Sequence, residues 1–255
     1  AIKRKPFVFE LRDIWPESIR AVGAMEESRA LDLLEKLELF LYRRAAAVVS
    51  VTHSFKQNLI SRGIDGNKLH VVTNGVDSSR FHQIPKDAAL AAELNVEGCF
   101  VAGYIGTHGM AHALDTLLDA AAILQDDPQA QHIRIVFLGH GAARDGLMAR
   151  AEELGLTNVI FRASVPRSAV PGYWSLFDAA LIHLRRTELF KTVIPSKMFE
   201  CMGMGIPIVL GVEGEAAEIV RQTGAGITIE PENSLQLAEQ LKTLSCEPQP
   251  LKEMS

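Results

Sequence analysis

Short apolar runs alternate with amphipathic segments along most of the chain. Beyond residue 99, six runs rich in valine and isoleucine have the length and composition of buried parallel strands. They span Phe100–Gly106, Ile133–Gly139, Asn158–Ala163, Asp178–Leu184, Ile206–Leu210 and Gly226–Ile229. Apolar residues at helical spacing fill the intervals, in Ala113–Leu124, Asp145–Leu154, Ser168–Leu176, Ser196–Met204, Glu215–Gln222 and Ser234–Leu244. This alternation predicts an α/β fold built on a doubly wound parallel sheet.

The N-terminal part of the chain repeats the pattern on a smaller scale. Strands are predicted over Lys5–Leu11, Ala45–Thr52 and Lys68–Gly75, with helices over Leu31–Tyr42 and Ser54–Arg62 between them. The polar, alanine-rich stretch Asp77–Gly98 then interrupts the rhythm. We therefore expect a domain over residues 1–84, a linker over 85–98, a second domain over 99–247 and a tail over 248–255. The sequence does not begin with methionine and a strand follows almost directly after Ala1, so we also expect a fragment; the family resemblance given below implies the interior of a longer protein, truncated at both ends.

Composition narrows the class of protein. With 255 residues and 47% hydrophobic content, the chain can bury one large core or two modest ones, as a soluble globular protein does. A net charge of −5 disfavours nucleic-acid binding, because phosphate contacts need a basic surface. Cys99, Cys201 and Cys246 lack the spacing of a disulfide framework or a metal site, so reduced thiols in the cytoplasm fit best. No apolar run approaches the roughly 20 residues that span a bilayer.

Ligands of doubly wound sheets bind beyond the carboxyl ends of the strands, which makes the loops at those ends candidate sites. Four such loops stand out, at Gly106–His112, Gly139–Gly146, Arg185–Lys197 and Gly211–Glu215. Glycines let backbone amides approach an anion closely, and helix N-termini favour negative charge, so a phosphate or diphosphate site is predicted. The run GYIGTHG lacks the GxGxxG spacing of dinucleotide-binding folds, which disfavours a nicotinamide-dependent dehydrogenase.

The stretch PSKMFECMGMGIPIVL combines a short helix, a turn and a buried strand. Pro195 suits a first helical turn, and the Ser196 hydroxyl is expected to cap free amide hydrogens. Gly203 and Gly205 suit the C-terminal end of the helix. Glu200 is the one carboxylate on this largely apolar helix. It is either a ligand-binding residue or a partly exposed surface glutamate.

Four segments of the chain match a known family in sequence and in order. They are VVTNGVDSSRF (Val71–Phe81), GYIGTHGMAHALDTLLDAA (Gly103–Ala121), PSKMFECMGMGIPIV (Pro195–Val209) and GEAAEIVRQTGAGITIEP (Gly214–Pro231). Together they resemble the second half of a family 4 glycosyltransferase. The match is closest to bacterial enzymes of surface-polysaccharide and lipopolysaccharide synthesis, including the group described as fucosamine transferases. The resemblance implies the GT-B architecture, in which a C-terminal Rossmann-like domain binds a nucleotide-sugar donor and an N-terminal Rossmann-like domain supplies the acceptor site.

On the donor side, the resemblance matches Glu200 to the second glutamate of the family's EX7E motif, a hydrogen-bond acceptor for the donor ribose hydroxyls. The first glutamate of the motif falls at Thr192. The family's arginine and lysine after the first strand of the donor domain fall at Thr107 and His112. The first departure removes the glutamate that usually contacts the sugar, and the second leaves the donor diphosphate without its usual cations.

Other groups are expected to bind the diphosphate instead: backbone amides near Gly106 and Gly109, His108 or His112 on condition that the ring is protonated, and the basic side chains of Arg185, Lys191 or Lys197. Either histidine is alternatively a surface-loop residue, and Lys197 is alternatively a plain solvated lysine. The expected donor-binding residues are Gly106, Thr107, His108, Gly109, His112, Gly139, Val165, Arg185, Lys191, Thr192, Ser196, Lys197 and Glu200.

On the acceptor side, FELRDIWP resembles a family segment in which a histidine precedes aspartate and tryptophan. Arg12 stands at the histidine position, where it could orient a phosphate or sugar but cannot act as a general base, because it stays protonated. The expected catalytic residues are Arg12, Asp13 and Glu200. Alternatively, Arg12 and Asp13 form a structural ion pair, and Trp15 is a core residue instead of a sugar platform.

The resemblance implies a retaining glycosyltransferase, with a UDP-sugar favoured as donor and a hexosyl or N-acetylhexosaminyl group transferred. No cofactor and no metal are expected, since no His/Asp/Glu cluster has metal-ligand spacing. The implied acceptor is a glycan or a polyprenyl-linked sugar, reached by peripheral contact with the inner face of the cytoplasmic membrane. Two alternatives stay open, a GT-B nucleotide-sugar epimerase and a chain that binds a nucleotide sugar without turnover.

Overall fold

The computed structural model describes residues 5–21 and 29–246. The chain divides into two compact units. The first unit comprises the chain up to Asn74 together with Thr187–Ile194 and Gly214–Ala216, and the second comprises the remainder from Gly75 onward. The predicted tail at 248–255 lies outside the described residues.

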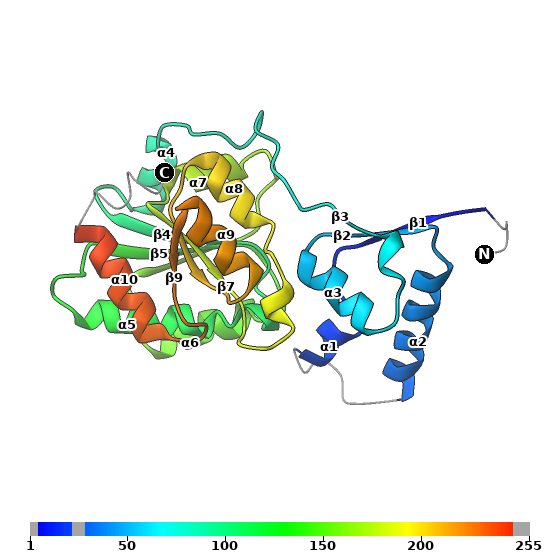
Figure 1. Cartoon of the computed structure of the whole chain (residues 1–255). Coiled ribbons are helices and arrows are strands. Elements are labelled where there is room, and N and C mark those ends of the chain that lie inside the picture. The colour runs from blue at the N-terminus through cyan, green and yellow to red at the C-terminus, as the bar shows by residue number, and fades with distance from the viewer. Residues whose placement is uncertain (1–4, 22–28, 247–255) are drawn as a thin grey trace. The chain divides into compact units, whose positions relative to one another are not determined.

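The first unit is a small parallel sheet with helices packed against it (Figure 1). Its strands β1 (Val8–Leu11), β2 (Ala47–Ser50) and β3 (Leu69–Val71) lie in the order β1-β2-β3. Its helices are α1 (Glu17–Ala21), α2 (Arg29–Arg44) and α3 (His53–Ser61), with single 3-10 turns η1 (Gly66–Lys68) and η3 (Phe190–Thr192). Buried side chains from the strands and from α2 and α3 form one core, which includes Leu11, Tyr42, Val48, Phe55 and Leu59.

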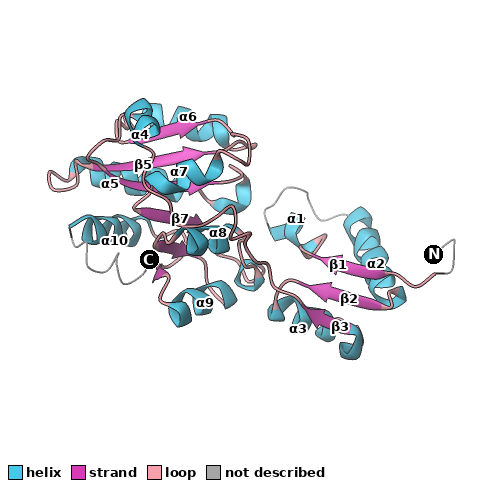
Figure 2. Ribbon diagram, turned by 90° about the horizontal axis from the view of Figure 1, so that it is seen from above, coloured by secondary structure: helices cyan, strands magenta, loops and turns pink. Residues whose placement is uncertain are grey.

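The second unit is a six-stranded parallel sheet with helices on both faces (Figure 2). Its strands are β4 (Phe100–Ile105), β5 (Ile133–Leu138), β6 (Val159–Arg162), β7 (Ala179–His183), β8 (Ile208–Gly211) and β9 (Gly226–Thr228). Their spatial order is β6-β5-β4-β7-β8-β9. The six predicted strands are therefore confirmed, each within two residues of its predicted ends. The helical elements are α4 (Ala88–Leu94), η2 (Met110–His112), α5 (Asp115–Asp126), α6 (Arg144–Glu153), α7 (Val170–Leu176), α8 (Lys197–Met204), α9 (Glu215–Thr223) and α10 (Ser234–Cys246).

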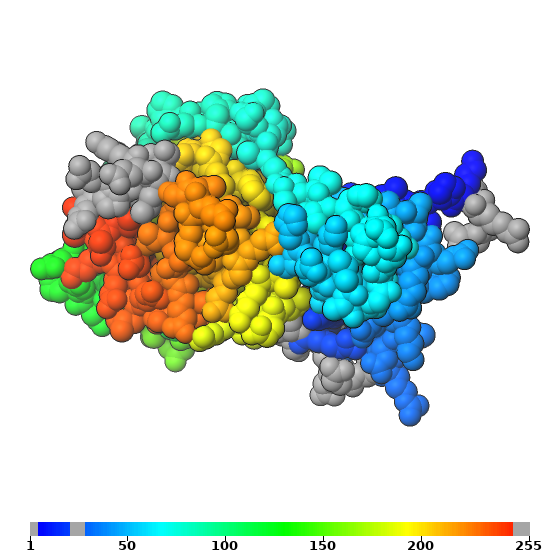
Figure 3. All heavy atoms as spheres, in the orientation of Figure 1, coloured from blue at the N-terminus to red at the C-terminus, as the bar shows by residue number. Residues whose placement is uncertain are grey.

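The main core of the second unit lies between one face of the sheet and helices α5, α6 and α10. Ala102 and Tyr104 alternate with Gly103 along β4, so their side chains point to this face. They pack with buried leucines of α5 and α10, which run side by side. In the space-filling view, α9 and α10 (orange to red) form part of the near surface of the second unit (Figure 3). On the opposite sheet face, α7 and α8 pack against each other, and the Phe177 ring fills the space over Gly103.

The segment predicted as a linker, 85–98, contains helix α4. The Asp87 side chain accepts a hydrogen bond from the Leu90 amide (3.0 Å), and Asn95 ends the helix in the left-handed conformation at φ 54°. Leu94 and Val96 are buried. The linker prediction is wrong for this segment, because it packs within the second unit. In the first unit, β3 ends at Val71 instead of continuing to Gly75.

Candidate functional site

The order of the strands creates a crevice between β4 and β7. Chain connections leave β4 toward β5 on one side and return to β7 on the other, which is the topological switch point where doubly wound sheets bind ligands. The loops that follow the two strands meet there, since the Arg185 amide donates a hydrogen bond to the Ala111 carbonyl (2.9 Å). The architecture therefore places residues 106–112 and 184–186 at one candidate site.

A cleft of about 250 Å³ opens at the carboxyl ends of β4, β5 and β6. It brings together four residues expected from the sequence, Gly106, Thr107, Gly139 and Val165. Its wall is largely aliphatic and its rim is polar. The complete lining is Ile105, Gly106, Thr107, Leu138, Gly139, His140, Ser164, Val165 and Val170. A flat ring with polar edges, such as a nucleobase, fits walls of this chemistry.

The two loops at the mouth of this cleft approach each other more closely than side chains would allow. A Cβ on Gly139 would lie 1.9 Å from the Gly106 carbonyl oxygen, and Gly139 has φ +151°. A Cβ on Gly141 would lie 2.4 Å from the His108 carbonyl oxygen. Backbone hydrogen bonds tie the loops together, from the His108 amide to the His140 carbonyl (3.0 Å) and from the Ala143 amide to the His108 carbonyl (2.9 Å). The backbones of these two loops are thus tied together and form the floor of the cleft.

Two amides on this floor have no hydrogen-bond acceptor in the part of the chain that the structure describes. Within the described residues, the Thr107 and Gly109 N–H groups donate no hydrogen bond. The loop is nevertheless held in place, since the Tyr104 hydroxyl donates to the Thr107 carbonyl (2.8 Å) and the His112 amide donates to the Gly109 carbonyl (3.1 Å). Fixed amides with no internal partner are suited to an anion.

Lys197, the first residue of α8, brings a cation to the same place. Its ammonium lies 3.9 Å from the centroid of the Tyr104 ring, and a Cβ on Gly106 would be 2.6 Å from Nζ. No carboxylate of the described residues forms an ion pair with it. Burial lowers the pKa of Lys197 to about 8, against the weak opposing influence of Cys201 and Glu200. The lysine is partly buried over an aromatic ring, so the alternative of a plain solvated lysine is wrong.

Burial disfavours the charged forms of His108 and His112. His108 is fully buried, and within the described part of the chain neither of its ring nitrogens has a hydrogen-bond partner. Burial lowers the pKa of both rings to about 4, with Arg144 and Lys197 adding to the effect at His108 and Lys197 at His112. The condition under which the histidines were expected to bind the diphosphate, a protonated ring, is therefore not favoured near neutral pH, and the surface-loop alternative for His108 is wrong. Nitrogen Nε2 of His108 faces Gly139, since a Cβ there would lie 3.2 Å from it.

His183, which the sequence analysis did not select, joins three segments behind the site. Its Nδ1 donates to the His112 carbonyl (2.8 Å), and its Nε2 accepts a hydrogen bond from the Glu232 amide (2.9 Å). Burial lowers the pKa of His183, which keeps the ring in the neutral form that can donate at one nitrogen and accept at the other. Its position at the end of β7, directly before Leu184 and Arg185, is the signal that would have identified it.

Glu200 is placed one turn after Lys197 on α8, in the second unit. It is partly buried, and its Oε2 accepts a hydrogen bond from Trp174 Nε1 (3.3 Å). Gly205 ends the helix with φ 66°, as predicted. Ser196 precedes the helix, but its hydroxyl makes no capping hydrogen bond, because the residue itself has helical dihedral angles (φ −58°, ψ −28°). The predicted serine cap is therefore wrong.

Two expected donor residues fall in the other unit. Lys191 and Thr192 belong to residues 187–194, which pack with the first unit. Lys191 forms an ion pair with Glu188 (2.7 Å), and the Thr192 hydroxyl donates to the Leu189 carbonyl (2.6 Å). The loop Gly211–Glu215, predicted to bind phosphate, makes a different contact. The carboxylate of its last residue, Glu215, accepts a hydrogen bond from the Ser54 amide (3.0 Å) at the start of α3.

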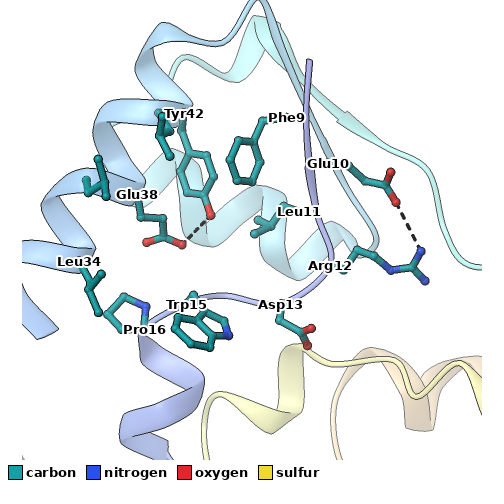
Figure 4. Close-up of a pocket in the computed structure, with 12 residues that line it drawn as sticks. Phe9, Glu10, Leu11, Arg12, Asp13, Trp15, Pro16, Leu34, Glu38 and Tyr42 are labelled. Atoms are coloured by element: carbon teal, nitrogen blue, oxygen red, sulfur yellow. Dashed lines mark hydrogen bonds and ion pairs between the residues drawn. The ribbon is translucent and has the colours of Figure 1, made fainter. Parts of the chain in front are cut away.

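A second hollow, of about 350 Å³, lies in the first unit between β1, the following loop and α2 (Figure 4). Most of its wall is apolar, and Trp15, which is 55% exposed, forms part of that wall. Its buried carboxylate, Glu38, is neutralised by bonds from the Tyr42 hydroxyl (2.5 Å) and Arg62 Nη2 (2.8 Å). The lining is Phe9, Glu10, Leu11, Arg12, Asp13, Trp15, Pro16, Leu34, Leu37, Glu38, Leu41 and Tyr42.

The residues expected on the acceptor side all line this hollow. Arg12 pairs with Glu10 (3.5 Å) and donates to Asn74 Oδ1 (3.0 Å), both contacts being exposed. The alternative of an Arg12–Asp13 ion pair is wrong, because Asp13 forms no ion pair within the described residues. Exposure also rules out a core position for Trp15. The exposed indole of Trp15 is suited to stacking on a sugar ring, and the neighbouring Asp13 carboxylate is suited to accepting hydrogen bonds from the hydroxyls of the sugar.

Comparison with known proteins defines the class. The six-stranded unit and the smaller parallel sheet have a GT-B type of fold. A crystal structure of Anabaena Alr3699/HepE in complex with UDP and glucose superposes with a TM-score of 0.81 at 22% identity, over 99% of this chain and 65% of that one. Sucrose-phosphate synthase from Thermosynechococcus elongatus gives 0.70 at 16% identity, over 97% of this chain and 66% of that one.

Family models then place the chain in a family. The model for glycosyl transferases group 1 matches residues 99–247, and the model for glycosyltransferase family 4 matches residues 1–80. The chain therefore belongs to the group 1 glycosyltransferases, which confirms the family predicted from its motifs. A glycosyltransferase named for teichuronic acid biosynthesis, TuaH of Bacillus subtilis (strain 168), is 26% identical over 204 residues, which are 79% of this chain. The chain spans about half the length of TuaH, 49%, and 65% of HepE.

Proposed function

We propose that the chain forms the donor-binding part, and a portion of the acceptor side, of a retaining glycosyltransferase. The enzyme transfers a hexosyl or N-acetylhexosaminyl group from a UDP-sugar to a glycan or lipid-linked acceptor of bacterial surface-polysaccharide synthesis. The observation that carries the proposal is the Lys197 ammonium, which lies beside Gly106 at the switch point and is neutralised by no carboxylate of residues 5–21 and 29–246. A diphosphate supplies the missing negative charge.

The neighbouring groups correspond to the other parts of a nucleotide sugar. The aliphatic cleft beside Val165 receives the base, Glu200 accepts the ribose hydroxyls, and Lys197 with the Thr107 and Gly109 amides binds the diphosphate. This arrangement offers one cation and two amides in place of the family's arginine and lysine. In the first unit, Trp15 and Asp13 are the residues proposed to bind the acceptor.

Relatives support the choice of donor and pathway. HepE has been crystallised with UDP and with UDP-glucose, and TuaH is named for teichuronic acid biosynthesis. A UDP-sugar and a surface polysaccharide are therefore the first choices. The likeness to fucosamine transferases stays a resemblance of the motifs alone.

The acceptor is proposed to be reached at the inner face of the cytoplasmic membrane. Across residues 5–21 and 29–246, no helix has the length and apolar character needed to cross a bilayer. Contact with a lipid-linked acceptor requires only the membrane surface, so we propose a peripheral association.

Calorimetric titration tests the donor site. We expect UDP and UDP-sugars to bind and GDP to bind at least tenfold more weakly. Glu200→Ala should weaken UDP binding by tenfold or more, because hydrogen bonds to a charged group are lost. Glu153→Ala, an exposed carboxylate at the end of α6, is the matched control and should bind as the wild type does. A folded wild-type protein that binds none of these nucleotides would contradict the proposal.

Retention is tested separately in an active full-length enzyme. The anomeric configuration of the first-formed product, read by NMR, should equal that of the donor. An inverted product would contradict the retaining mechanism while leaving the donor site intact.

A further inference from the structure

Trp174 makes the hydrogen bond that the structure gives to the Glu200 side chain. The indole Nε1 on α7 donates to Glu200 Oε2 on α8 at 3.3 Å. The two residues are 26 positions apart, and their helices pack against each other in the second unit. The contact therefore depends on the tertiary fold and not on local sequence.

The indole is held firmly. Trp174 is 0% exposed, and its ring meets the Phe177 ring edge to face, with centroids 5.6 Å apart. Phe177 in turn occupies the space over Gly103, where a Cβ would lie 1.9 Å from the ring. A shift of the indole would thus disturb the central strand β4. A buried N–H without an acceptor is costly, so the indole and the carboxylate stabilise each other.

This bond fixes an otherwise flexible carboxylate. Glutamate has three rotatable side-chain bonds, and a partly exposed one samples several rotamers. Engaging Oε2 holds the plane of the Glu200 carboxylate and leaves Oε1 available. A group that must accept from adjacent hydroxyls gains affinity when it is already oriented before the ligand arrives.

We propose that Trp174 is a positioning residue, whose indole N–H orients the Glu200 carboxylate so that it can select the ribose hydroxyls of the donor nucleotide. This inference rests on the proposed function. The competing explanation is purely structural: Glu200 satisfies the buried indole and never contacts a ligand. The two explanations agree about stability and differ about ribose selectivity.

The test measures that selectivity by calorimetry with UDP, 2′-deoxy-UDP and 3′-deoxy-UDP. The wild type is expected to prefer UDP over the deoxy form that lacks the contacted hydroxyl by about tenfold or more. Trp174→Phe removes the N–H and keeps an aromatic ring, so the preference should fall to about threefold or less. The control, Phe177→Leu, loosens the same aromatic contact and keeps the N–H, so it should retain the wild-type preference even if it lowers stability.

A second replacement at position 174 keeps the test valid if Trp174→Phe fails to fold. Benzothienylalanine at position 174 exchanges the N–H for sulfur with little change in shape, and it should reduce the preference in the same way. In a Glu200→Ala background, which leaves the indole no side-chain acceptor to orient, Trp174→Phe should change the preference no further, because the two groups act as one unit.

The outcomes separate the inference from the proposed function. If the N–H-deficient proteins keep the wild-type ribose preference, or if the losses add in the double variant, Trp174 is not a positioning residue. A wild type that binds UDP without preferring any ribose hydroxyl also overturns the inference, while nucleotide binding stands. A wild type that binds no nucleotide overturns both.

Discussion

At the scale of one residue, Lys197 indicates a binding site because its partly buried ammonium group lacks a carboxylate partner among the described residues. Placing an ammonium group where it is partly shielded from water costs free energy, and the Tyr104 ring returns about 0.5–2 kcal/mol of it. A carboxylate would offset the remainder, yet none of the described residues supplies one. The lowered pKa of Lys197 reflects this uncompensated cost of burying the charge. A bound anionic ligand would supply the missing negative charge.

Binding of UDP is therefore expected to weaken as the pH rises above about 8. Below its pKa of about 8, Lys197 carries the charge that attracts the diphosphate. Above it, the free protein loses this proton and must recover it to bind, so affinity should fall toward tenfold per pH unit. The measurement is the Kd for UDP by calorimetry from pH 6.5 to 9.5.

Arginine at this position provides the matched comparison. Lys197→Arg keeps its charge throughout the range, so its affinity should decline only by the amount that titration of uracil itself causes. Lys197→Met should bind weakly at every pH. Identical pH profiles for the wild type and Lys197→Arg would show that Lys197 does not bind the diphosphate.

At the scale of elements, the site depends on two loops whose backbones touch. Gly106 and Gly139 both have φ in the region that disfavours side chains, +145° and +151°. Their close approach forms the floor that presents the free amides beside Lys197. The glycines therefore serve to bring backbones together, and their number alone says nothing about phosphate binding.

Gly139→Ala is expected to destabilise the protein by about 3 kcal/mol or more, because the new methyl group would overlap the Gly106 carbonyl and strain the backbone. It should also abolish UDP binding. Gly146→Ala is the matched control, since Gly146 lies within α6 with open space around its Cβ position. That variant should be more stable by about 0.5–1 kcal/mol. Urea unfolding measures both, and equal stabilities would refute the packing argument.

The helices and strands were predicted well wherever a clear hydrophobic pattern marks them in the sequence. All six strands of the second unit follow from runs such as IRIVFL, because a strand buried on both faces must be apolar throughout. Helix α4 was missed, although its signals were present: Asp87 at the start, an alanine-rich interior and Asn95 at the end. Amphipathic contrast is weak in AALAAEL, so the segment looked like a linker.

Contacts of the site were less predictable than its loops. Loop positions such as Gly106, Gly139 and Val165 follow from the ends of strands, and the structure brings them together. The partners Tyr104, Trp174 and His183 were not foreseen, because they lie in apolar elements where pattern alone suggests core. The sequence also left open whether His108 is protonated, because the burial of its ring depends on the neighbouring loop.

At the scale of the whole molecule, the chain contains two compact units with separate cores. The proposed donor site belongs to the second unit alone, whereas Trp15 and Asp13 belong to the first. The chain has two tryptophans, and each unit contains one, Trp15 in the first and Trp174 in the second. Fluorescence can therefore follow each unit separately.

Heating or urea should unfold the two units in separable transitions, and UDP should stabilise only the second. At a UDP concentration of 100 times Kd, the expected gain in its free energy of unfolding is about 2.7 kcal/mol, because UDP binds the folded unit alone. Trp15→Phe leaves Trp174 as the reporter and should show this gain in full. Trp174→Phe leaves Trp15 as the reporter, and its transition should stay where it is without UDP and with UDP at 100 times the Kd of this variant. If UDP shifts the Trp15 transition as much as the Trp174 transition, the units unfold as one cooperative body, and the donor site cannot be assigned to the second unit by stability alone.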